Sequence, residues 1–223
     1  MEFNLKDLNY KIMPNDYSEH DLSFKVIVIG DSGVGKSCLT NKATKNIFEE
    51  NYSATVGFEF CTFNIKINNK IIKLQIWDTC GQELYRSLIT NFYRNASFAV
   101  IVYAINSENS FNDIDMWLKE LRTNSNPDVK IILIGNKIDL ENERKITKEQ
   151  GELYAKNNNL IKFYETSAKN GINVKRTFVE IAYILYKDYK QYMDDDNSNG
   201  SAVIQGNTKK IDNRRRKKSG CCS

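Results

Sequence analysis

Short apolar runs alternate with helical patterns along most of the chain. Residues 24–29 form an apolar run that ends at Gly30, and residues 98–104 and 129–134 form two more continuous runs of strand length. Continuous apolar runs of this kind are typical of central strands covered on both faces. Residues 161–164 are a shorter and weaker strand candidate.

Two further segments alternate apolar and polar positions and predict a β-hairpin. Residues 58–67 and 71–77 both show this alternation, and the turn residues Asn68 and Asn69 lie between them. Alternation on both sides of a short turn is the pattern expected of two paired antiparallel strands.

Helices are expected between the strands. Ser110 and Asp113 match a capping box, and apolar residues follow at intervals of three and four up to residue 121. Thr147 and Gln150 open a second helix in the same way, and residues 174–185 carry an apolar stripe. Strands separated by such helices favour right-handed crossovers. We therefore predict an α/β fold: a doubly wound, mostly parallel six-stranded sheet with one antiparallel edge hairpin and helices on both faces.

One domain accounts for these elements. We expect residues 23–189 to form it, residues 1–22 to be a flexible N-terminal extension, and residues 190–223 to be a flexible tail, because residues 194–207 are mostly polar. No apolar run reaches the roughly 18 residues that a membrane helix needs. The first residues lack the apolar core of a signal peptide, so we do not expect secretion.

Composition and charge exclude several classes of protein. With 41% hydrophobic and 27% charged residues, wholesale disorder is excluded. The single histidine, His20, disfavours a zinc cluster, and the five cysteines show no metal or redox spacing, so we expect reduced thiols in the cytosol. Residues 209–223 carry seven basic residues and one acidic residue, whereas the whole chain is only +4. This imbalance favours an electrostatic tether over a nucleic-acid-binding domain.

The sharpest chemical signal is the octapeptide GDSGVGKS at residues 30–37, between a predicted strand and a predicted helix. It fits the pattern G-x-x-x-x-G-K-[ST], in which glycines let backbone N–H groups approach phosphate oxygens. Lys36 would reach the β- and γ-phosphates, and the Ser37 hydroxyl would bind Mg²⁺. The sequence therefore predicts a P-loop NTPase, the alternative being a glycine-rich turn with a chance Lys-Ser pair.

A second motif concerns the base. The sequence NKID at residues 136–139 follows a predicted strand, and the carboxylate of Asp139 can accept both N–H groups on the Watson–Crick edge of guanine. Adenine would leave that charge unpaired, which strongly disfavours its binding. The stretch from Thr166 to Lys169 could complete the base pocket through its backbone, or it could simply be a turn that leads into a helix.

A third motif, WDTCGQE at residues 77–83, ends the second strand of the hairpin. Asp78 suits a carboxylate at the Mg²⁺ site, Gly81 an amide that faces the γ-phosphate, and Gln82 the group that orients the attacking water. With Thr55 in the preceding loop, two segments would sense the third phosphate. A merely polar loop is the alternative, and it is disfavoured because Asp78 follows an apolar strand.

Five motifs in this order and at these spacings resemble a Rab-family small GTPase of the Ras superfamily: GDSGVGKS, TVGFEF (55–60), WDTCGQE, NKID and ETSAK (165–169). The resemblance covers residues 24–189 and the tail. It implies that Phe48 packs on the guanine and that Ser37, Thr55 and Asp78 form the metal site. The residues expected to bind the nucleotide are Ser32, Gly33, Val34, Gly35, Lys36, Ser37, Cys38, Phe48, Thr55, Gly81, Asn136, Lys137, Asp139, Ser167, Ala168 and Lys169, with Gln82 as the catalytic residue.

The resemblance also implies two switch segments, at about residues 47–60 and 78–94, and an aromatic surface patch of Phe60, Trp77 and Phe92. Three positions depart from the family pattern. Phe92 stands where most Rabs have Tyr, and Leu84 stands where Arg or Lys is usual. Cys80 replaces the usual Ala, and we interpret it as a small buried hydrophobe, with a redox role as the alternative.

The family resemblance implies GTP and GDP as ligands, Mg²⁺ as cofactor and GTP hydrolysis as activity. No built-in arginine finger is evident, so we expect slow turnover, near 10⁻⁴ s⁻¹ by order of magnitude. The implied partners are an exchange factor, a GTPase-activating protein, effectors and a GDP-dissociation inhibitor, with no nucleic acid and a monomeric state. Two alternatives stay open: a GTP-binding interaction module with negligible hydrolysis, and a P-loop kinase, which NKID and the tail disfavour.

The chain ends in Cys221 and Cys222 followed by a serine. Gly220 stands fourth from the end, where a single-prenylation box needs cysteine, so the pair resembles a double-geranylgeranyl signal instead. Two lipids anchor a protein stably where one does not, and nearby basic residues add attraction to an anionic leaflet. We expect lipidation of both cysteines and residence on the cytoplasmic face of an endomembrane (vesicle, Golgi or endosome), with cycling through the cytosol.

Overall fold

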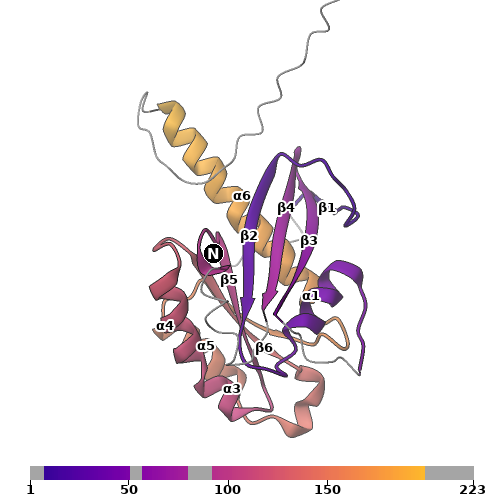
Figure 1. Ribbon diagram of the computed structural model, residues 1–223, viewed down its shortest axis with the longest axis vertical. Coiled ribbons are helices and arrows are strands. Elements are labelled where there is room, and N and C mark those ends of the chain that lie inside the picture. Colours follow the sequence, from indigo (N-terminus) through magenta and orange to yellow (C-terminus); the bar gives the residue numbers. More distant parts are fainter. Residues whose placement is uncertain (1–7, 51–56, 80–91, 199–223) are drawn as a thin grey trace, which may run out of the picture.

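A seven-stranded sheet forms the centre of the molecule (Figure 1). The computed structural model describes residues 8–50, 57–79 and 92–198. The strand order is β1-β3-β4-β2-β5-β6-β7; β3 runs antiparallel to β1 and β4, and every other neighbouring pair is parallel. The strands are β1 (Tyr10–Ile12), β2 (Leu22–Ile29), β3 (Phe58–Ile67), β4 (Lys70–Thr79), β5 (Phe98–Ala104), β6 (Lys130–Asn136) and β7 (Lys162–Thr166).

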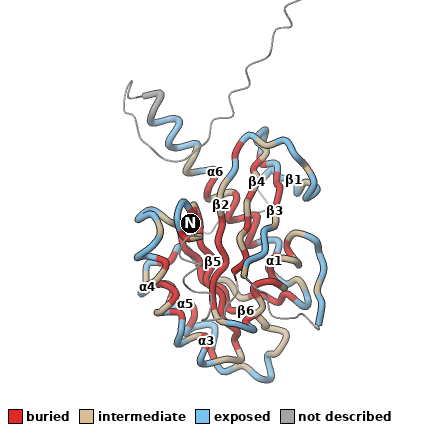
Figure 2. Tube along the Cα trace, in the orientation of Figure 1, coloured by how far each residue is buried: buried red, intermediate tan, exposed pale blue. Residues whose placement is uncertain are grey.

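Helices cover both faces of the sheet. The helices are α1 (Lys36–Lys45), α3 (Glu108–Asn112), α4 (Ile114–Asn124), the short η3 (Ile138–Glu143), α5 (Lys148–Asn157) and α6 (Val174–Ser198). Alternate residues of β2 show the two layers: Val26 and Val28 face α1 and α6, whereas Ile27 and Ile29 face α4 and α5. Figure 2 shows buried residues along β2, β5 and β6, and every residue of β5 is buried. The predicted doubly wound α/β fold is confirmed.

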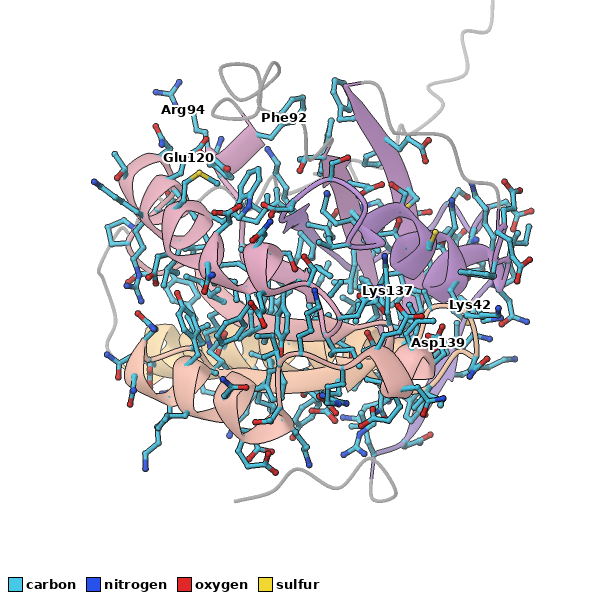
Figure 3. The ribbon with its side chains drawn as sticks, turned by 90° about the horizontal axis from the view of Figure 1, so that it is seen from below. Lys42, Phe92, Arg94, Glu120, Lys137 and Asp139 are labelled. Carbon is cyan, nitrogen blue, oxygen red and sulfur yellow. The ribbon has the colours of Figure 1, made fainter. Side chains whose placement is uncertain are left out.

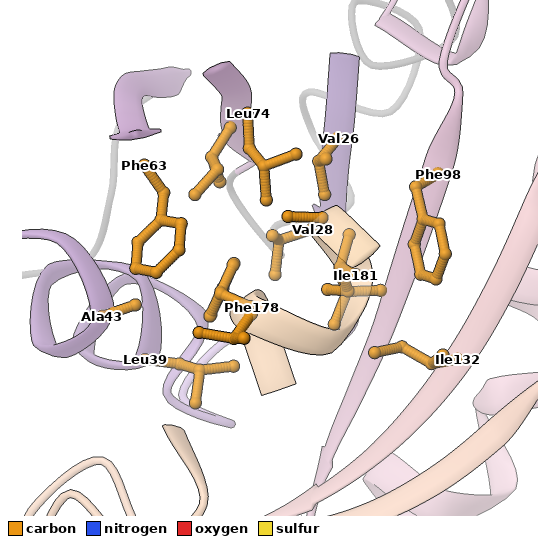
Figure 4. Close-up of a cluster of buried hydrophobic side chains, with 14 of the residues drawn as sticks. Val26, Val28, Leu39, Ala43, Phe63, Leu74, Phe98, Ile132, Phe178 and Ile181 are labelled. Atoms are coloured by element: carbon orange, nitrogen blue, oxygen red, sulfur yellow. The ribbon is translucent and has the colours of Figure 1, made fainter. Parts of the chain in front are cut away.

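The apolar stripe predicted over residues 174–185 is the part of α6 that packs on the sheet. Phe178 and Ile181 lie in one buried cluster with Leu39 and Ala43 of α1 and with residues of β2, β3 and β4 (Figure 4). The rings of Phe63 and Phe178 lie 5.9 Å apart between centroids. This cluster fixes α1, which begins at the phosphate-binding motif, against the sheet.

Two local predictions need correction. The sheet has seven strands and not six, because β1, which lies within the N-terminal extension, pairs with the end of β3. Its three residues are exposed and carry no periodic apolar pattern, so only the pairing reveals it. The second correction concerns the capping box predicted at Ser110. The helical segment after β5 is capped by Ser107 instead, whose side chain accepts a hydrogen bond from the Ser110 amide. Ser110 itself is buried, and its hydroxyl accepts a hydrogen bond from the backbone amide of Ala104.

Other predicted boundaries hold with small shifts. The hairpin of residues 58–77 is confirmed as β3 and β4, and the capping box of Thr147 and Gln150 is present at α5. Helix α6 continues to Ser198, beyond the expected domain boundary at residue 189. Among the described helices, none combines the length and the apolar character of a membrane span.

Candidate nucleotide-binding site

A cavity of about 490 Å³ opens where β2, β6 and β7 end. Ligands of open α/β sheets bind at the carboxyl ends of the strands, so the position is the expected one. The lining comes from five stretches of chain: Ser32, Gly33, Gly35, Lys36, Ser37 and Cys38; Phe48, Glu49 and Glu50; Thr79; Asn136, Lys137, Asp139 and Leu140; and Ala168 and Lys169.

The loop after β2 brings positive charge and the start of a helix to one end of the cavity. The Lys36 ammonium donates to the carbonyl oxygens of Gly30 (2.8 Å) and Asp31 (2.7 Å), so it folds back over the loop. Helix α1 begins at Lys36, directly after its N-cap residue Gly35, with no side-chain cap and no acidic residue in its first turn. Phosphate is the group that such a helix start binds well.

Two residues that are 41 positions apart form a buried polar pair beside this loop. The Ser37 hydroxyl donates to Oδ2 of Asp78, while Oδ1 of Asp78 is buried without a hydrogen-bond partner among the described residues. Burial raises the pKa of Asp78 to about 6, against the lowering effects of the Ser37 hydrogen bond and the Lys36 charge. A divalent cation would supply what the orphaned oxygen lacks. The hard oxygen donors of Ser37 and Asp78 fit Mg²⁺.

The other end of the cavity is built from the loops after β6 and β7. The Asp139 carboxylate accepts a hydrogen bond from the Ser167 hydroxyl at 2.5 Å. Asn136 is buried and links this region to the phosphate-binding loop, since its amide nitrogen donates to the carbonyl of Val34 at 3.0 Å. Figure 3 shows Lys137 and Asp139 together just after β6, where η3 begins. A carboxylate at this place can receive the paired N–H groups of a guanine edge.

The structure brings together most of the residues predicted to bind a nucleotide. Twelve of them line the cavity, and the two others that are described, Val34 and Ser167, lie behind it, bonded to Asn136 and Asp139. Five predicted site residues lie outside the described residues: Thr55, Gly81, Gln82, Cys221 and Cys222. Cys80 and Leu84, two of the three positions that depart from the family pattern, also lie outside them.

Four lining residues were not predicted: Glu49, Glu50, Thr79 and Leu140. Glu49, Thr79 and Leu140 each follow a predicted site residue in the sequence, and this adjacency was the signal by which they could have been found. Glu50 also forms an ion pair with Lys169 at 2.9 Å, which joins the stretch after α1 to the loop after β7. Both side chains are largely exposed, so this pair contributes little to stability.

The predicted aromatic patch lies on another part of the surface. The ring of Trp77 lies 5.1 Å from that of Phe60 and 5.2 Å from that of Phe92. Phe58, which was not predicted for this patch, joins it at 4.4 Å from Phe92, and it is 48% exposed. The Lys25 ammonium lies 5.3 Å from the Trp77 ring centre. In Figure 3, Phe92 lies well apart from Lys137 and Asp139.

Residues 25–187 match the model of the Ras family. This chain belongs to the Ras family. Among its relatives, the Ras-related protein RABA1b of Arabidopsis thaliana is 39% identical over 208 residues, which cover 92% of this chain and 96% of the relative. The Ras-related protein RABA1f of the same plant is 39% identical over 209 residues, with the same coverage. The chain is thus a Rab-family small GTPase, and its activity is the hydrolysis of GTP.

Proposed function

We propose that this GTPase is a membrane-anchored switch in intracellular vesicle traffic, which holds GDP or GTP with Mg²⁺ in the 490 Å³ cavity. One observation carries the proposal. The phosphate-binding loop, the NKID stretch and the loop after β7 all meet at this cavity, and the buried Asn136 of the NKID stretch bonds to Val34 on one side and to Thr166 and Ala168 on the other. These three motifs lie far apart in the chain and would otherwise have no reason to converge on one space.

In this proposal each end of the cavity has its own task. Lys36 and the first amides of α1 bind the phosphates, while Asp139 selects guanine and Phe48 packs on the base. Ser37, Asp78 and Thr55 hold Mg²⁺, which supplies positive charge to the phosphate oxygens. The γ-phosphate would then order the two switch segments, and the loss of that phosphate would release them.

The selectivity of the cavity for guanine tests the proposal directly. The substitution Asp139→Asn replaces a pure acceptor by an amide that can donate to the 2-carbonyl of xanthine. We expect GDP affinity to fall by about 10²–10⁴-fold and xanthosine diphosphate to bind better than GDP, by calorimetry on nucleotide-free protein. Asp128→Asn, at an exposed aspartate that does not line the cavity, is the matched control. Equal binding of ADP and GDP by the unaltered protein would refute the proposal.

Hydrolysis is proposed to be slow and to depend on Gln82, which would orient the attacking water. A Gln82→Leu protein should bind GTP normally and lose most of its single-turnover hydrolysis, and an added activating protein should not restore it. The exposed Gln191 of α6 provides a control, because Gln191→Leu should hydrolyse GTP at the unaltered rate. Unchanged hydrolysis in the Gln82 variant would remove Gln82 from the mechanism.

Effector binding is proposed for the surface formed by Phe58, Phe60, Trp77 and Phe92. Phe58 and Phe60 expose about half of their side-chain area, and aromatic rings of this kind carry much of the binding energy at protein interfaces. The patch spans β3, the end of β4 and the segment that leads to β5, so it adjoins both proposed switches. The exchange factor, the activating protein and the GDP-dissociation inhibitor would act on the same switch segments.

A further inference from the structure

The N-terminal extension is bonded to the edge of the sheet. We call residues 8–21 the N-terminal strap. In its first part, β1 pairs with the end of β3, and the Met13 amide donates to the Asn64 carbonyl at 2.8 Å. At its end, the Asp21 side chain accepts from the Ile71 amide at 2.8 Å and from Lys70 at 3.0 Å. The strap therefore follows the outer edge of β3 and reaches β4.

A buried asparagine holds the middle of the strap. Asn64 of β3 is 1% exposed, and its amide nitrogen lies 3.0 Å, 3.1 Å and 3.3 Å from the carbonyl oxygens of Pro14, Asn15 and Tyr17. Three carbonyls that converge on one amide define the path of the chain at this point. The strap is thus fixed by a specific side chain and not by general packing alone.

Asn15 of the strap connects two elements of the GTPase domain. Its side-chain amide donates to the carbonyl of Thr44 at 2.6 Å, and its own carbonyl accepts from the Thr62 hydroxyl at 3.1 Å. Thr44 lies in the last turn of α1, and Thr62 lies in β3. These two elements precede and follow residues 46–57, so Asn15 connects the helix before that stretch with the strand after it.

The last turn of α1 matters because the cavity lining continues directly from it. The helix ends at Lys45, Asn46 takes a left-handed conformation (φ 59°), and Phe48 and Glu50 follow as lining residues. Thr44 is the last helical residue but one, and its hydroxyl also donates to the Thr40 carbonyl at 2.8 Å. A shift of Thr44 would therefore also move the stretch that follows α1, in which Phe48 lines the cavity.

We propose that Asn15 is a positioning residue for nucleotide retention: by bridging Thr44 and Thr62 it fixes the end of α1, from which residues 46–50 continue along one side of the cavity. The inference rests on the proposed binding of a guanine nucleotide in that cavity. Asn15 touches no nucleotide itself and acts through Phe48 and its neighbours. A strap that is released from Thr44 therefore speeds nucleotide loss without changing the phosphate-binding residues.

The test measures how fast a fluorescent GDP analogue leaves the loaded full-length protein with Mg²⁺ present. Loss of the hydrogen bond to Thr44 at the end of α1 should raise the release rate of Asn15→Ala about two- to tenfold. Asn15→Gln, which keeps the donor, should recover part of the slow release. Asn9→Ala is the matched control, because this strap asparagine bonds to Asn68 through its backbone carbonyl, which the substitution keeps. We expect it to release the analogue at the unaltered rate.

A second variant and a double substitution separate positioning from general stability. Thr62→Val removes the hydroxyl on the β3 side with little change in shape, and it should also speed release. In a Phe48→Ala background, Asn15→Ala should have no further effect on release. The release rates of the two proteins are compared at temperatures equally far below their thermal midpoints. Release within error of the unaltered rate in both Asn15→Ala and Thr62→Val would overturn the positioning role alone. Failure of the unaltered protein to retain GDP would overturn the proposed function as well.

Discussion

The side-chain amide of Asn136 donates to the carbonyl of Val34 across 3.0 Å, and thereby joins two loops that lie 102 positions apart in the chain. The oxygen of the same side chain accepts from the Thr166 hydroxyl at 3.0 Å and from the Ala168 amide at 3.3 Å. Asn136 is 1% exposed, so water does not compete for these bonds. One side chain thus holds the phosphate end and the base end of the cavity in a fixed relation.

Removal of this side chain should weaken both the fold and the site. Asn136→Ala leaves buried groups of Val34 and Ala168 without partners, and we expect the free energy of unfolding to fall by about 1–3 kcal/mol. GDP affinity should fall at least about tenfold, as measured by calorimetry beside urea denaturation. Asn124→Ala, at an exposed asparagine that bonds within α4, should change neither quantity measurably. An Asn136→Ala protein with unaltered GDP affinity would contradict this role.

The first glycine of the phosphate-binding loop should tolerate no side chain. A Cβ on Gly30 would lie 2.1 Å from the backbone oxygen of Val102, and φ at Gly30 is +137°. We expect Gly30→Ala to lower the free energy of unfolding by at least about 3 kcal/mol, because a backbone atom of a central strand cannot move away. Gly33→Ala meets no atom within 4 Å and should cost only about 1–2 kcal/mol for its positive φ. Equal melting temperatures for the two variants would contradict the steric argument.

Acid should selectively weaken the contact between α6 and β7. Glu180 is 1% exposed and accepts hydrogen bonds from Lys162 at 2.6 Å, from Arg176 at 3.0 Å and from Tyr164. Burial alone would raise the pKa of Glu180, but these bonds together hold it below its ordinary value. A lowered pKa stabilises the fold above the unfolded-state pKa, and that stabilisation is lost as the pH falls through the folded-state pKa.

Glu180→Gln should therefore lower the free energy of unfolding by about 1–3 kcal/mol at pH 7. The difference from the unaltered protein should persist at pH 5.5 and shrink below the ordinary glutamate pKa of 4.5. Urea denaturation at pH 7, 5.5 and 3.5 measures both trends. Glu152→Gln, at an exposed ion pair of α5, should show almost no difference at any of these pH values. A constant Glu180→Gln difference down to pH 3.5 would contradict the linkage.

The C-terminal cysteines should control membrane attachment. Replacement of both, Cys221→Ser with Cys222→Ser, should move the protein from the membrane fraction to the soluble fraction of cells, because the basic run alone binds reversibly. Mass spectrometry of the unaltered protein should find two added lipids. Ser219→Ala with Ser223→Ala keeps both thiols and should leave the distribution unchanged. Persistent membrane association of the cysteine variant would count against lipid anchoring.

The linear motifs predicted the loop after β2 and the NKID stretch, and the apolar runs predicted the strands of the doubly wound sheet, because each of these signals lies within a few consecutive residues. The glycines around Lys36 bend the chain locally, and continuous apolar runs must be buried on both faces. For that reason Gly33, Lys36 and Asp139 could be assigned to the cavity before any fold was known.

Other features depend on pairs of groups that meet only after folding. The sequence does not reveal the contacts of the strap, because Asn15 and Asn64 are ordinary polar residues until the strap lies beside β3. Ser107 caps its helix in place of Ser110 because the burial of Ser110 directs that hydroxyl towards β5. A residue pattern encodes local backbone preference and burial, whereas a hydrogen bond between distant segments forms only when packing removes water from both partners.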